Sequence, residues 1–276
     1  MENKIGRLVL KGASPFDAAL TLDCGQSFRW RECENGKWHG VAFGRSVDVY
    51  TEGDSLIVEG EVCEADEKLW REYFDLDTDY AAICENLKAD GWLNKAISAY
   101  TGIRILKQEP WEALCSFIIS QNNNIPRIKG IIERLCVQFG EELHCGDFSF
   151  PSAQIIAEKT AEDLAPLRAG FRAKYIIDAA KKVADKTVDL DKISDMNIDD
   201  ARPELQKISG VGPKVAECTL LYGFGRKDAF PVDVWVRRIM AELYPDGLPE
   251  CTRGVEGIAQ QYLFHWRRNI ENPFEE

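Results

Sequence analysis

The sequence lacks the cysteine spacings that hold metal clusters. Its nine cysteines are scattered along 276 residues, and no two of them stand in a CxxC arrangement. That spacing suits neither zinc nor an iron–sulfur cluster. A disulfide framework is also disfavoured in a chain of this size. We therefore expect reduced thiols and no iron–sulfur cluster.

Long apolar segments are also missing. The first ten residues, MENKIGRLVL, lack the apolar core of a signal peptide. No apolar run approaches the roughly 20 residues that a membrane span needs. No basic tail suggests nuclear import. We expect a cytoplasmic protein with no membrane partner.

Positive charge is in short supply. The chain has 34 Lys and Arg against 46 Asp and Glu, which gives a formal net charge of −12. Taken alone, this acidity argues against a nucleic-acid partner, because polyanions repel acidic surfaces. Net charge is a mean, however, and a small basic face or a set of backbone amides can still bind phosphate.

What the sequence does contain is a change of period. The first sixty residues alternate polar and apolar side chains in short runs separated by Gly, Asn and Asp, which predicts an antiparallel sheet. From about Glu64 the apolar residues recur at steps of three and four, which predicts helices. The predicted strands are SFRWRE, KWHGVAFG, SVDVY and SLIVEG. The later predicted helices include 110–121, 125–140, 173–186, 202–208, 213–224, 234–243 and 258–270.

The fold class that follows is α+β. We expect an N-terminal antiparallel β-sheet domain followed by an all-α helix-hairpin-helix domain. The boundary falls in the region 64–106, and we divide the chain into residues 1–105 and 106–276. The early helices could belong to either part.

The stretch ELQKISGVGPKVAECTLLYGF predicts a helix, a hairpin and a second helix. Gly210 and Gly212 permit backbone conformations that other residues avoid, and Pro213 suits the first position of a helix. Free N–H groups in such a turn, beside a helix N-terminus, form an anion site. A DNA phosphate would fit there without any basic side chain.

Lys214 comes directly after this turn, where the helix dipole and partial burial both favour a neutral amine. A neutral amine is a nucleophile that can form a Schiff base. Cys218 lies four residues on, on the same helix face. Asp233, in PVDVW, is placed to cap the next helix, and an ionised carboxylate there could stabilise a developing cation.

These residues resemble a known group of enzymes. SGVGPKVAECTLLYGFGRKDAFPVDVWVRRI resembles the hairpin, loop and aspartate of the helix-hairpin-helix DNA glycosylase superfamily. LDCGQSFRWRE, CSFIISQNNNIPRIKGIIERLC, GFRAKYI and AQQYLF resemble the 8-oxoguanine DNA glycosylase/AP lyase family, from about residue 22 to 264. The resemblance implies a bifunctional enzyme that flips out and excises 8-oxoguanine and then cleaves the abasic site by β-elimination.

The resemblance also implies roles in catalysis. Lys214 would attack C1′ of the damaged nucleotide and form the Schiff base, and Asp233 would support departure of the base. The carbonyl of Gly25 would accept the N7–H that only the oxidised base carries. The flipped base would also contact three further residues. Cys218 and Phe264 would sandwich it, and Gln260 would read its Watson–Crick edge.

Other positions are implied to contact the DNA. Asn122 would fill the gap left by the base, and Phe171 would wedge into the stack. Asn122, Arg127 and Arg172 would contact the orphaned cytosine. The implied phosphate contacts are the amides of Gly210, Gly212 and Val215, with Trp235 nearby. Carbonyls of Gln206, Ile208 and Val211 would surround a monovalent cation, and no other cofactor is expected.

The sequence departs from the better-known eukaryotic members at two of these positions. Phe171 stands where they carry a tyrosine wedge, and Trp235 replaces a histidine that contacts phosphate. The missing basic C-terminal tail implies a prokaryotic, nucleoid-associated protein. The missing four-cysteine cluster argues against endonuclease III and adenine glycosylase. We expect a monomer whose partner is double-stranded DNA containing 8-oxoguanine.

Each site residue also has a plainer structural interpretation. Asp233 would simply cap a helix, Phe264 would pack in the core, and Lys214 would lie on the surface. The triple asparagine could be a turn, and Gln260 and the arginines could be solvated. The alternative functions are a glycosylase of the same fold for another damaged purine, such as an alkylated base, and a non-catalytic DNA-binding module.

Overall fold

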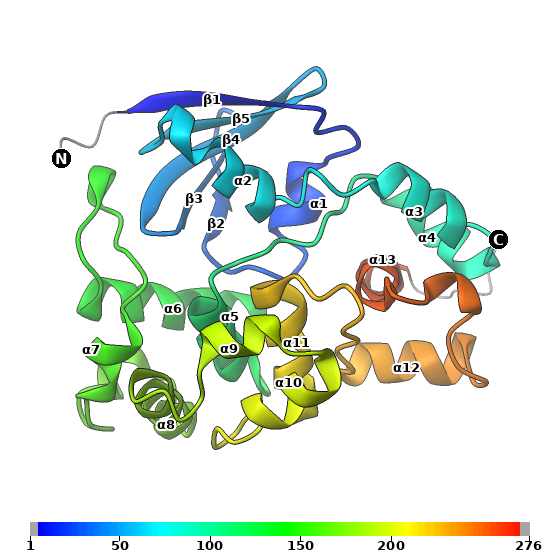
Figure 1. The fold of residues 1–276 in the computed structure, drawn as a ribbon. Helices are drawn as coiled ribbons and strands as arrows, with labels where there is room; N and C mark the ends of the chain where they lie inside the picture. Colours follow the sequence, from blue (N-terminus) through cyan, green and yellow to red (C-terminus); the bar gives the residue numbers. More distant parts are fainter. Residues whose placement is uncertain (1–4, 271–276) are drawn as a thin grey trace.

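The computed structural model describes residues 5–270. A sheet covers one side of the molecule and helices fill the rest (Figure 1). The sheet is antiparallel and five-stranded, in the order β1-β5-β4-β3-β2. Its strands are β1 (Gly6–Lys11), β2 (Trp30–Glu32), β3 (Trp38–Ala42), β4 (Arg45–Glu52) and β5 (Ser55–Gly60).

The four predicted strands are present, and β1 is an addition that the prediction missed. In β1, Leu8 and Leu10 are buried while the residues between and after them are exposed. This alternation is typical of a strand with one covered face, so β1 could have been predicted from the sequence. The register pairs Leu8 with Val58 and Leu10 with Leu56.

The motif GQSFRW ends in a tryptophan that anchors it to the sheet. Trp30 in β2 pairs with Gly40 in β3, and its ring lies where a side chain at Gly40 would be, with ring carbon Cε3 at 2.3 Å from an ideal Cβ. The indole N–H donates to the Tyr73 hydroxyl at 2.8 Å. Trp30 is 1% exposed. The loop before β2 is therefore fixed at one end by a buried aromatic side chain.

The helices of the first part are α1 (Ala18–Leu22), α2 (Glu67–Tyr73), α3 (Tyr80–Leu87) and α4 (Gly91–Ala99). The central helices are α5 (Pro110–Ser120), α6 (Ile125–Phe139), α7 (Ala153–Ala157), α8 (Arg172–Ala184) and α9 (Leu190–Asp195). The last are α10 (Ile198–Leu205), α11 (Pro213–Phe224), α12 (Val234–Leu243) and α13 (Glu256–Arg268).

Helices α11 and α12 span the predicted 213–224 and 234–243. The prediction was wrong about α10, which was expected over 202–208. The helix begins four residues earlier because Asn197 caps it by accepting from the amide of Asp200, and Pro203 lies inside it. The short helices α1, α7 and α9 were not predicted, since they have too few turns to show a period.

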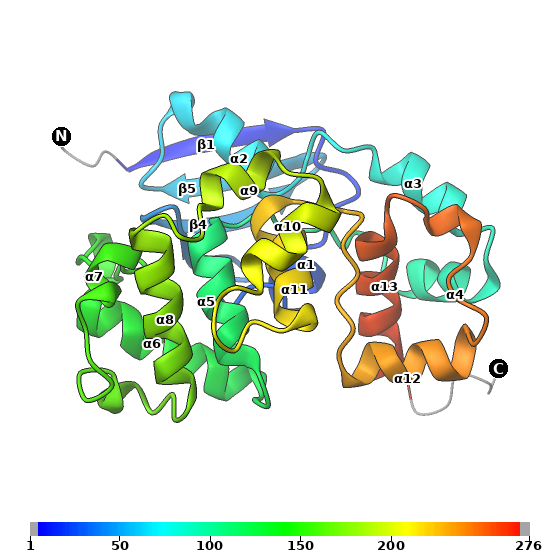
Figure 2. The same cartoon turned by 60° about the horizontal axis from the view of Figure 1, so that its bottom comes forward.

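Two apolar cores are present. One lies under the sheet and includes Trp30, Trp70 and Phe74. The other fills the helical part and includes side chains of α3 and α4, such as Tyr80 and Leu93, together with those of the later helices. Helix α4 packs against α13, which in turn packs against α12 (Figures 1 and 2). The division at residues 105 and 106 stays a prediction.

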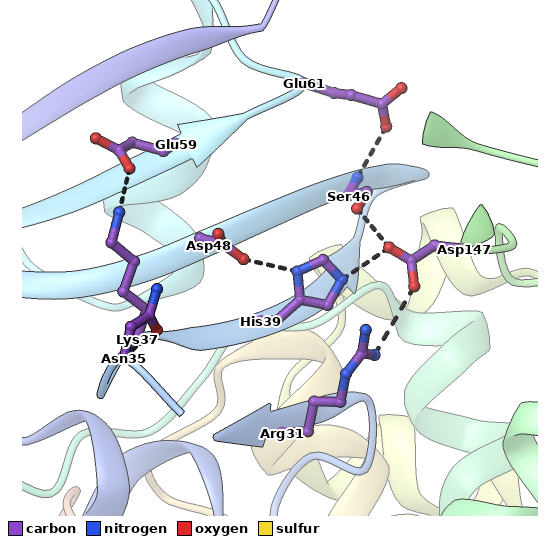
Figure 3. Close-up of polar contacts among 9 residues, drawn as sticks. All are labelled: Arg31, Asn35, Lys37, His39, Ser46, Asp48, Glu59, Glu61 and Asp147. Carbon is purple, nitrogen blue, oxygen red and sulfur yellow. Dashed lines mark hydrogen bonds and ion pairs between the residues drawn. The ribbon is translucent and has the colours of Figure 1, made fainter. Parts of the chain in front are cut away.

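A polar cluster joins the sheet to a loop of the helical part (Figure 3). His39 in β3 contacts Asp48 at 2.6 Å through Nδ1 and Asp147 at 2.8 Å through Nε2. Ser46 and Arg31 contact the same Asp147 carboxylate. An imidazole that faces a carboxylate on each side donates to both when it is protonated. This cluster ties the two parts together.

Candidate active site

The predicted hairpin lies between α10 and α11. Gly210 adopts a φ of +81°, and an added Cβ would meet the Tyr175 ring at 2.3 Å, so both backbone angle and space require glycine. Tyr175 belongs to α8, which packs against the hairpin. Another α8 residue, Asp178, accepts from the amide of Ser209 at 2.7 Å.

The amides that were predicted to face a phosphate are available. Among residues 5–270, the amides of Gly210, Gly212 and Val215 donate to no acceptor. Gly212 caps α11 without a side chain, and Pro213 follows at the first helical position. Unpaired amides at a helix N-terminus favour an anion.

Lys214 lies in the first turn of α11 and is half-buried. Its Nζ is 3.3 Å from the Ser120 hydroxyl oxygen and 5.2 Å from the centre of the Phe117 ring. Both contacts come from α5, which packs along α11 (Figure 2). The amine therefore points into the protein rather than into solvent. It has no carboxylate partner within ion-pair distance among the described residues.

Asp233 caps α12, as its plainer interpretation predicts. One carboxylate oxygen accepts from the amide of Val236 at 2.8 Å. The other oxygen has no donor among the residues that the structure describes. The capping bond holds the carboxylate in place, and the second oxygen is free to face a reacting group.

The pKa of the Cys218 thiol is influenced by burial and by both Lys214 and Asp233. Cys218 is 3% exposed. Burial raises the pKa of this thiol, the charge and hydrogen bond of Lys214 oppose the rise, and the Asp233 carboxylate adds to it. Lys214 and the Asp233 carboxylate thus both act electrostatically on this thiol, which is one wall of the predicted base site.

Glu217 braces this arrangement, and sequence reasoning missed it. It lies three residues after Lys214 on α11 and is 9% exposed. One carboxylate oxygen accepts from the amide of Phe230 at 2.7 Å, and the other contacts Arg202 of α10. The segment from Phe230 leads directly to Asp233. Glu217 therefore ties α11, which carries Lys214, to the loop that carries Asp233.

Gly25 lies in the loop before β2 with a φ of +90°, a conformation that favours glycine. The next residue, Gln26, is 1% exposed. Its amide nitrogen donates to the carbonyls of Thr21 and Arg104, both at 2.8 Å, and its oxygen accepts from the amide of Leu106 at 2.8 Å. These buried bonds fix the backbone beside Gly25.

Gln260 and Phe264 are four residues apart on α13 and so share one face. Gln260 is 5% exposed, which contradicts a surface role, and its buried Oε1 has no hydrogen-bond partner among the described residues. Phe264 is half-buried and belongs to neither apolar core of the described chain. Its ring lies 5.1 Å from the Arg268 guanidinium.

The residues predicted to face the opposite strand form a second group. Asn122 is exposed and has a φ of +46°. Arg172 is only 2% exposed, so the solvated interpretation is wrong. Its guanidinium donates to the carbonyls of Gln121, Asn122 and Ala169, with the bond to Asn122 at 3.0 Å. It therefore holds the strained asparagine loop from inside.

The other members of this group lie on the surface. Arg127 is exposed, with one contact of 3.4 Å to the carbonyl of Arg168. Phe171 is 51% exposed. Its ring lies 4.5 Å from the Arg172 guanidinium and edge-on to Tyr175. Trp235 is half-buried beside the guanidinium of Arg238, at 5.1 Å.

The predicted cation ligands lie at the end of α10 and in the hairpin. Gln206 caps α10, and the carbonyl of Ile208 accepts from the amide of Val211 at 3.0 Å. Within residues 5–270, no group of three or more His, Cys, Asp and Glu side chains could hold a metal ion. The same residues include no helix that is long and apolar enough to cross a membrane.

A cavity of about 300 Å³ lies away from these groups, between β2 and α6. Its lining includes Phe28, Trp30 and Lys129 but neither Lys214 nor Asp233. The candidate site is therefore defined by the positions of its side chains rather than by this cavity.

Two families match adjoining parts of the chain. The family described as 8-oxoguanine DNA glycosylase, N-terminal domain, matches residues 8–114. The HhH-GPD superfamily of base excision DNA repair proteins matches residues 115–249.

Full-length relatives agree with these matches. An N-glycosylase/DNA lyase of Saccharomyces cerevisiae is 33% identical, over 88% of this chain and 72% of its own length. A probable N-glycosylase/DNA lyase of Methanothermobacter thermautotrophicus is 35% identical, over 92% of this chain and 94% of its own.

A solved structure extends the likeness to three dimensions. The Clostridium acetobutylicum 8-oxoguanine glycosylase/lyase was solved with double-stranded DNA containing cytosine opposite 8-oxoG, and it has a TM-score of 0.86 to this chain. It is 37% identical, over 96% of this chain and 97% of that one. The fold, the hairpin with its lysine and these relatives agree: the chain is a DNA glycosylase/lyase and belongs to the 8-oxoguanine DNA glycosylase family.

Proposed function

We propose that this protein excises 8-oxoguanine from double-stranded DNA and cleaves the resulting abasic strand, with Lys214 as the nucleophile. The observation that carries the proposal is the placement of that amine. It is half-buried between the Phe117 ring and the Ser120 hydroxyl, beside Cys218 and without an ion-pair partner among the described residues.

The first chemical step breaks the bond between sugar and base. The lone pair of the neutral Lys214 Nζ forms a bond to C1′ while the C1′–N9 bond breaks. The electron pair of the broken C1′–N9 bond leaves with the base, together with a proton. The unpaired Asp233 oxygen stabilises the positive charge that develops on the sugar. The adduct then opens to a Schiff base, loses a proton from C2′ and expels the 3′ phosphate by β-elimination.

Recognition of the base uses groups that lack partners. The Gly25 carbonyl accepts the N7–H of the oxidised base, where guanine would present a lone pair. The buried Gln260 Oε1 needs a donor, and the Watson–Crick edge of the base supplies one. The base lies between Cys218 and Phe264, and Phe264 is free of either core.

The hairpin amides of Gly210, Gly212 and Val215 bind a phosphate. A monovalent cation at the carbonyls of Gln206, Ile208 and Val211 assists them, and no other cofactor takes part. Asn122 and Arg127 face the orphaned cytosine, and Arg172 acts there through the asparagine loop that it holds. Phe171 enters the stack, and Trp235 lies near the backbone. The protein acts as a monomer in the cytoplasm of a prokaryote, associated with the nucleoid.

Borohydride trapping tests the proposal. Reduction during reaction with a duplex containing 8-oxoguanine opposite cytosine should yield a covalent adduct, and Lys214→Gln should abolish it. Duplexes with 8-oxoguanine opposite each of the four bases, and one with an alkylated purine, define the substrate. If Lys214→Gln traps at the wild-type level, the nucleophile is another residue. If only the alkylated purine is released, the substrate is wrong.

A further inference from the structure

A continuous set of buried polar groups runs behind the base site. It consists of Gln26, Gln108, Tyr222 and Gln261, and we call it the brace. Their exposed fractions are 1%, 5%, 5% and 1%. None of them was singled out by the sequence, and none needs to touch the DNA. Buried polar side chains keep their position because every broken bond leaves an unsatisfied group.

The brace begins at the loop that carries Gly25. The side-chain amide of Gln108 donates to the main-chain carbonyl of Gln26 at 2.7 Å. The main-chain amide of Gln108 donates in turn to the carbonyl of Tyr222 at 2.7 Å. Gln108 thus connects the residue after Gly25 to α11, one turn beyond Cys218.

The brace then crosses from α11 to α13. The Tyr222 hydroxyl donates to Oε1 of Gln261 at 2.6 Å. Gln261 directly precedes Tyr262 and directly follows Gln260, the proposed reader of the Watson–Crick edge. Figures 1 and 2 both place α11 between α5 and α13, so this bond spans the two helices that flank the site.

Tyr222 also supports the nucleophile. Its ring stacks on that of Phe117, with centres 5.2 Å apart and planes at 22°. The same Phe117 ring lies 5.2 Å from Lys214 Nζ. Tyr222 is therefore connected to three parts of the site. Its hydroxyl contacts Gln261 of α13, its ring contacts Phe117 beside the amine, and its main-chain carbonyl is linked through Gln108 to the Gly25 loop.

We propose that Tyr222 and Gln261 are positioning residues that set the separation between the two base-reading groups, the Gly25 carbonyl and the Gln260 amide, and so determine discrimination between 8-oxoguanine and guanine. The inference rests on the proposed function of those two readers. At Gly25 a single hydrogen bond distinguishes 8-oxoguanine from guanine, and the strength of that bond depends steeply on distance and angle. A reader that is displaced by a fraction of an ångström loses selectivity before it loses binding.

The experiment uses Tyr222→Phe, which keeps the ring stack and removes only the hydroxyl. Two single-turnover rates are measured on the same duplex: excision of 8-oxoguanine, and cleavage at a preformed abasic site that offers no base to read. Excision should slow by about tenfold, as expected for one misplaced hydrogen bond, while abasic-site cleavage stays within about twofold of wild type. The affinity ratio between 8-oxoguanine and guanine duplexes should fall by a similar factor.

Tyr262→Phe is the matched control. Tyr262 is also on α13 and 1% exposed, but its hydroxyl donates to the carbonyl of Ile103 at 3.1 Å, away from the brace. It should leave the ratio of the two rates unchanged even if the protein is less stable. Gln261→Met should reproduce the Tyr222→Phe ratio, and the double variant should add little to either single one, because both break the same bond.

The outcomes separate the two proposals. If wild type releases no 8-oxoguanine, the proposed function and the brace both fall. If wild type releases it and Tyr222→Phe releases it equally fast, only the brace is wrong. Equal slowing of excision and abasic-site cleavage, or the same change of ratio in Tyr262→Phe, would show a general loss of structure and would also overturn the brace.

Discussion

The two halves of the candidate site are built in opposite ways. On the base side, the reactive and reading groups are held by bonds to residues behind them, and their functional atoms are left unpaired, as with the Gln260 Oε1 and one oxygen of Asp233. On the opposite-strand side, the Arg172 guanidinium donates its hydrogen bonds to main-chain carbonyls inside the protein. The exposed groups there are Asn122, Arg127 and Phe171.

The difference bears on where preorganisation is needed. Chemistry and base discrimination require geometry that is fixed within fractions of an ångström, and on the base side buried hydrogen bonds hold the groups proposed to act. On the opposite-strand side, the protein has only to keep the strands apart and fill the gap left by the flipped base. Exposed side chains on a supported loop are sufficient for that. Each of the following experiments tests this contrast.

The largest effect should come from Asp233→Asn. Asparagine caps a helix about as well as aspartate, so the melting temperature should barely change. The lost charge should slow excision by about 10²–10³-fold while DNA binding is retained, because the carboxylate acts on charge that develops in the transition state. Single-turnover excision and thermal melting measure the two quantities.

Asp79→Asn is the control for that variant, since Asp79 caps α3 by accepting from the amide of Ala82 at 2.9 Å, far from the site. It should leave excision unchanged. If Asp233→Asn excises 8-oxoguanine at the wild-type rate, Asp233 acts only as a helix cap.

The opposite-strand side should respond differently to its two arginines. Arg172→Ala removes several charge-assisted bonds to buried carbonyls and should lower the free energy of unfolding by about 3 kcal/mol. Arg127→Ala removes an exposed side chain and should change that free energy by less than about 0.5 kcal/mol. Urea denaturation gives both values.

Both arginine variants should excise 8-oxoguanine less selectively opposite cytosine. Arg127 would act by direct contact, and Arg172 through the loop that it supports. The contrast between the two sides fails if Arg172→Ala is as stable as wild type, or if Arg127→Ala keeps full preference for cytosine.

A pH effect on stability should come from a buried carboxyl on α5, the helix that also carries Phe117 and Ser120. Glu112 of α5 is 7% exposed, and burial raises its pKa to about 7, although the Arg29 cation, 3.6 Å away, opposes the rise. An unfolded glutamate ionises near about 4.3, so the unfolded chain releases this proton first. Stability from this group is therefore complete below about pH 4 and declines as the pH rises towards 7, by at most about 4 kcal/mol.

Glu112→Gln cannot ionise and should lack that decline. Urea denaturation of both proteins at pH 5 and pH 8 isolates the contribution of Glu112 from other titrating groups. The expected result is a wild-type loss between the two pH values that exceeds the loss in the variant. An equal loss in both would mean that the carboxylate is already ionised in the folded protein.

The smallest effect concerns salt. A chain with a net charge of −12 and a hairpin that offers backbone amides should release few counterions on binding. The slope of log affinity against log salt concentration should be shallow, about −3 to −4, which corresponds to a handful of phosphates. A slope near −8 would reveal a broad basic footprint and remove the contrast between amide and side-chain contacts.

Sequence reasoning succeeded where local punctuation is strong. Pro213 and Gly212 place the start of α11, and Asp233 places the start of α12, because caps and first-turn prolines act within a few residues. It failed for β1 and for the short helices α1, α7 and α9. It left open whether Arg172 contacts DNA or is solvated and did not foresee its burial, since burial of an arginine depends on carbonyls that lie about fifty positions away.

The positions of the proposed site residues along the chain, and the chemistry that their side chains can perform, were determined by the sequence itself: an amine after a glycine-rich turn, a carboxylate at the next helix start, and the motifs around Gly25 and Gln260. Only the tertiary structure decided which of their atoms are left without partners, and which groups hold them. The physical reason is range. Turn and cap signals extend over about one helical turn, whereas the bonds from Gln26 to Gln108 and from Tyr222 to Gln261 join residues 82 and 39 positions apart.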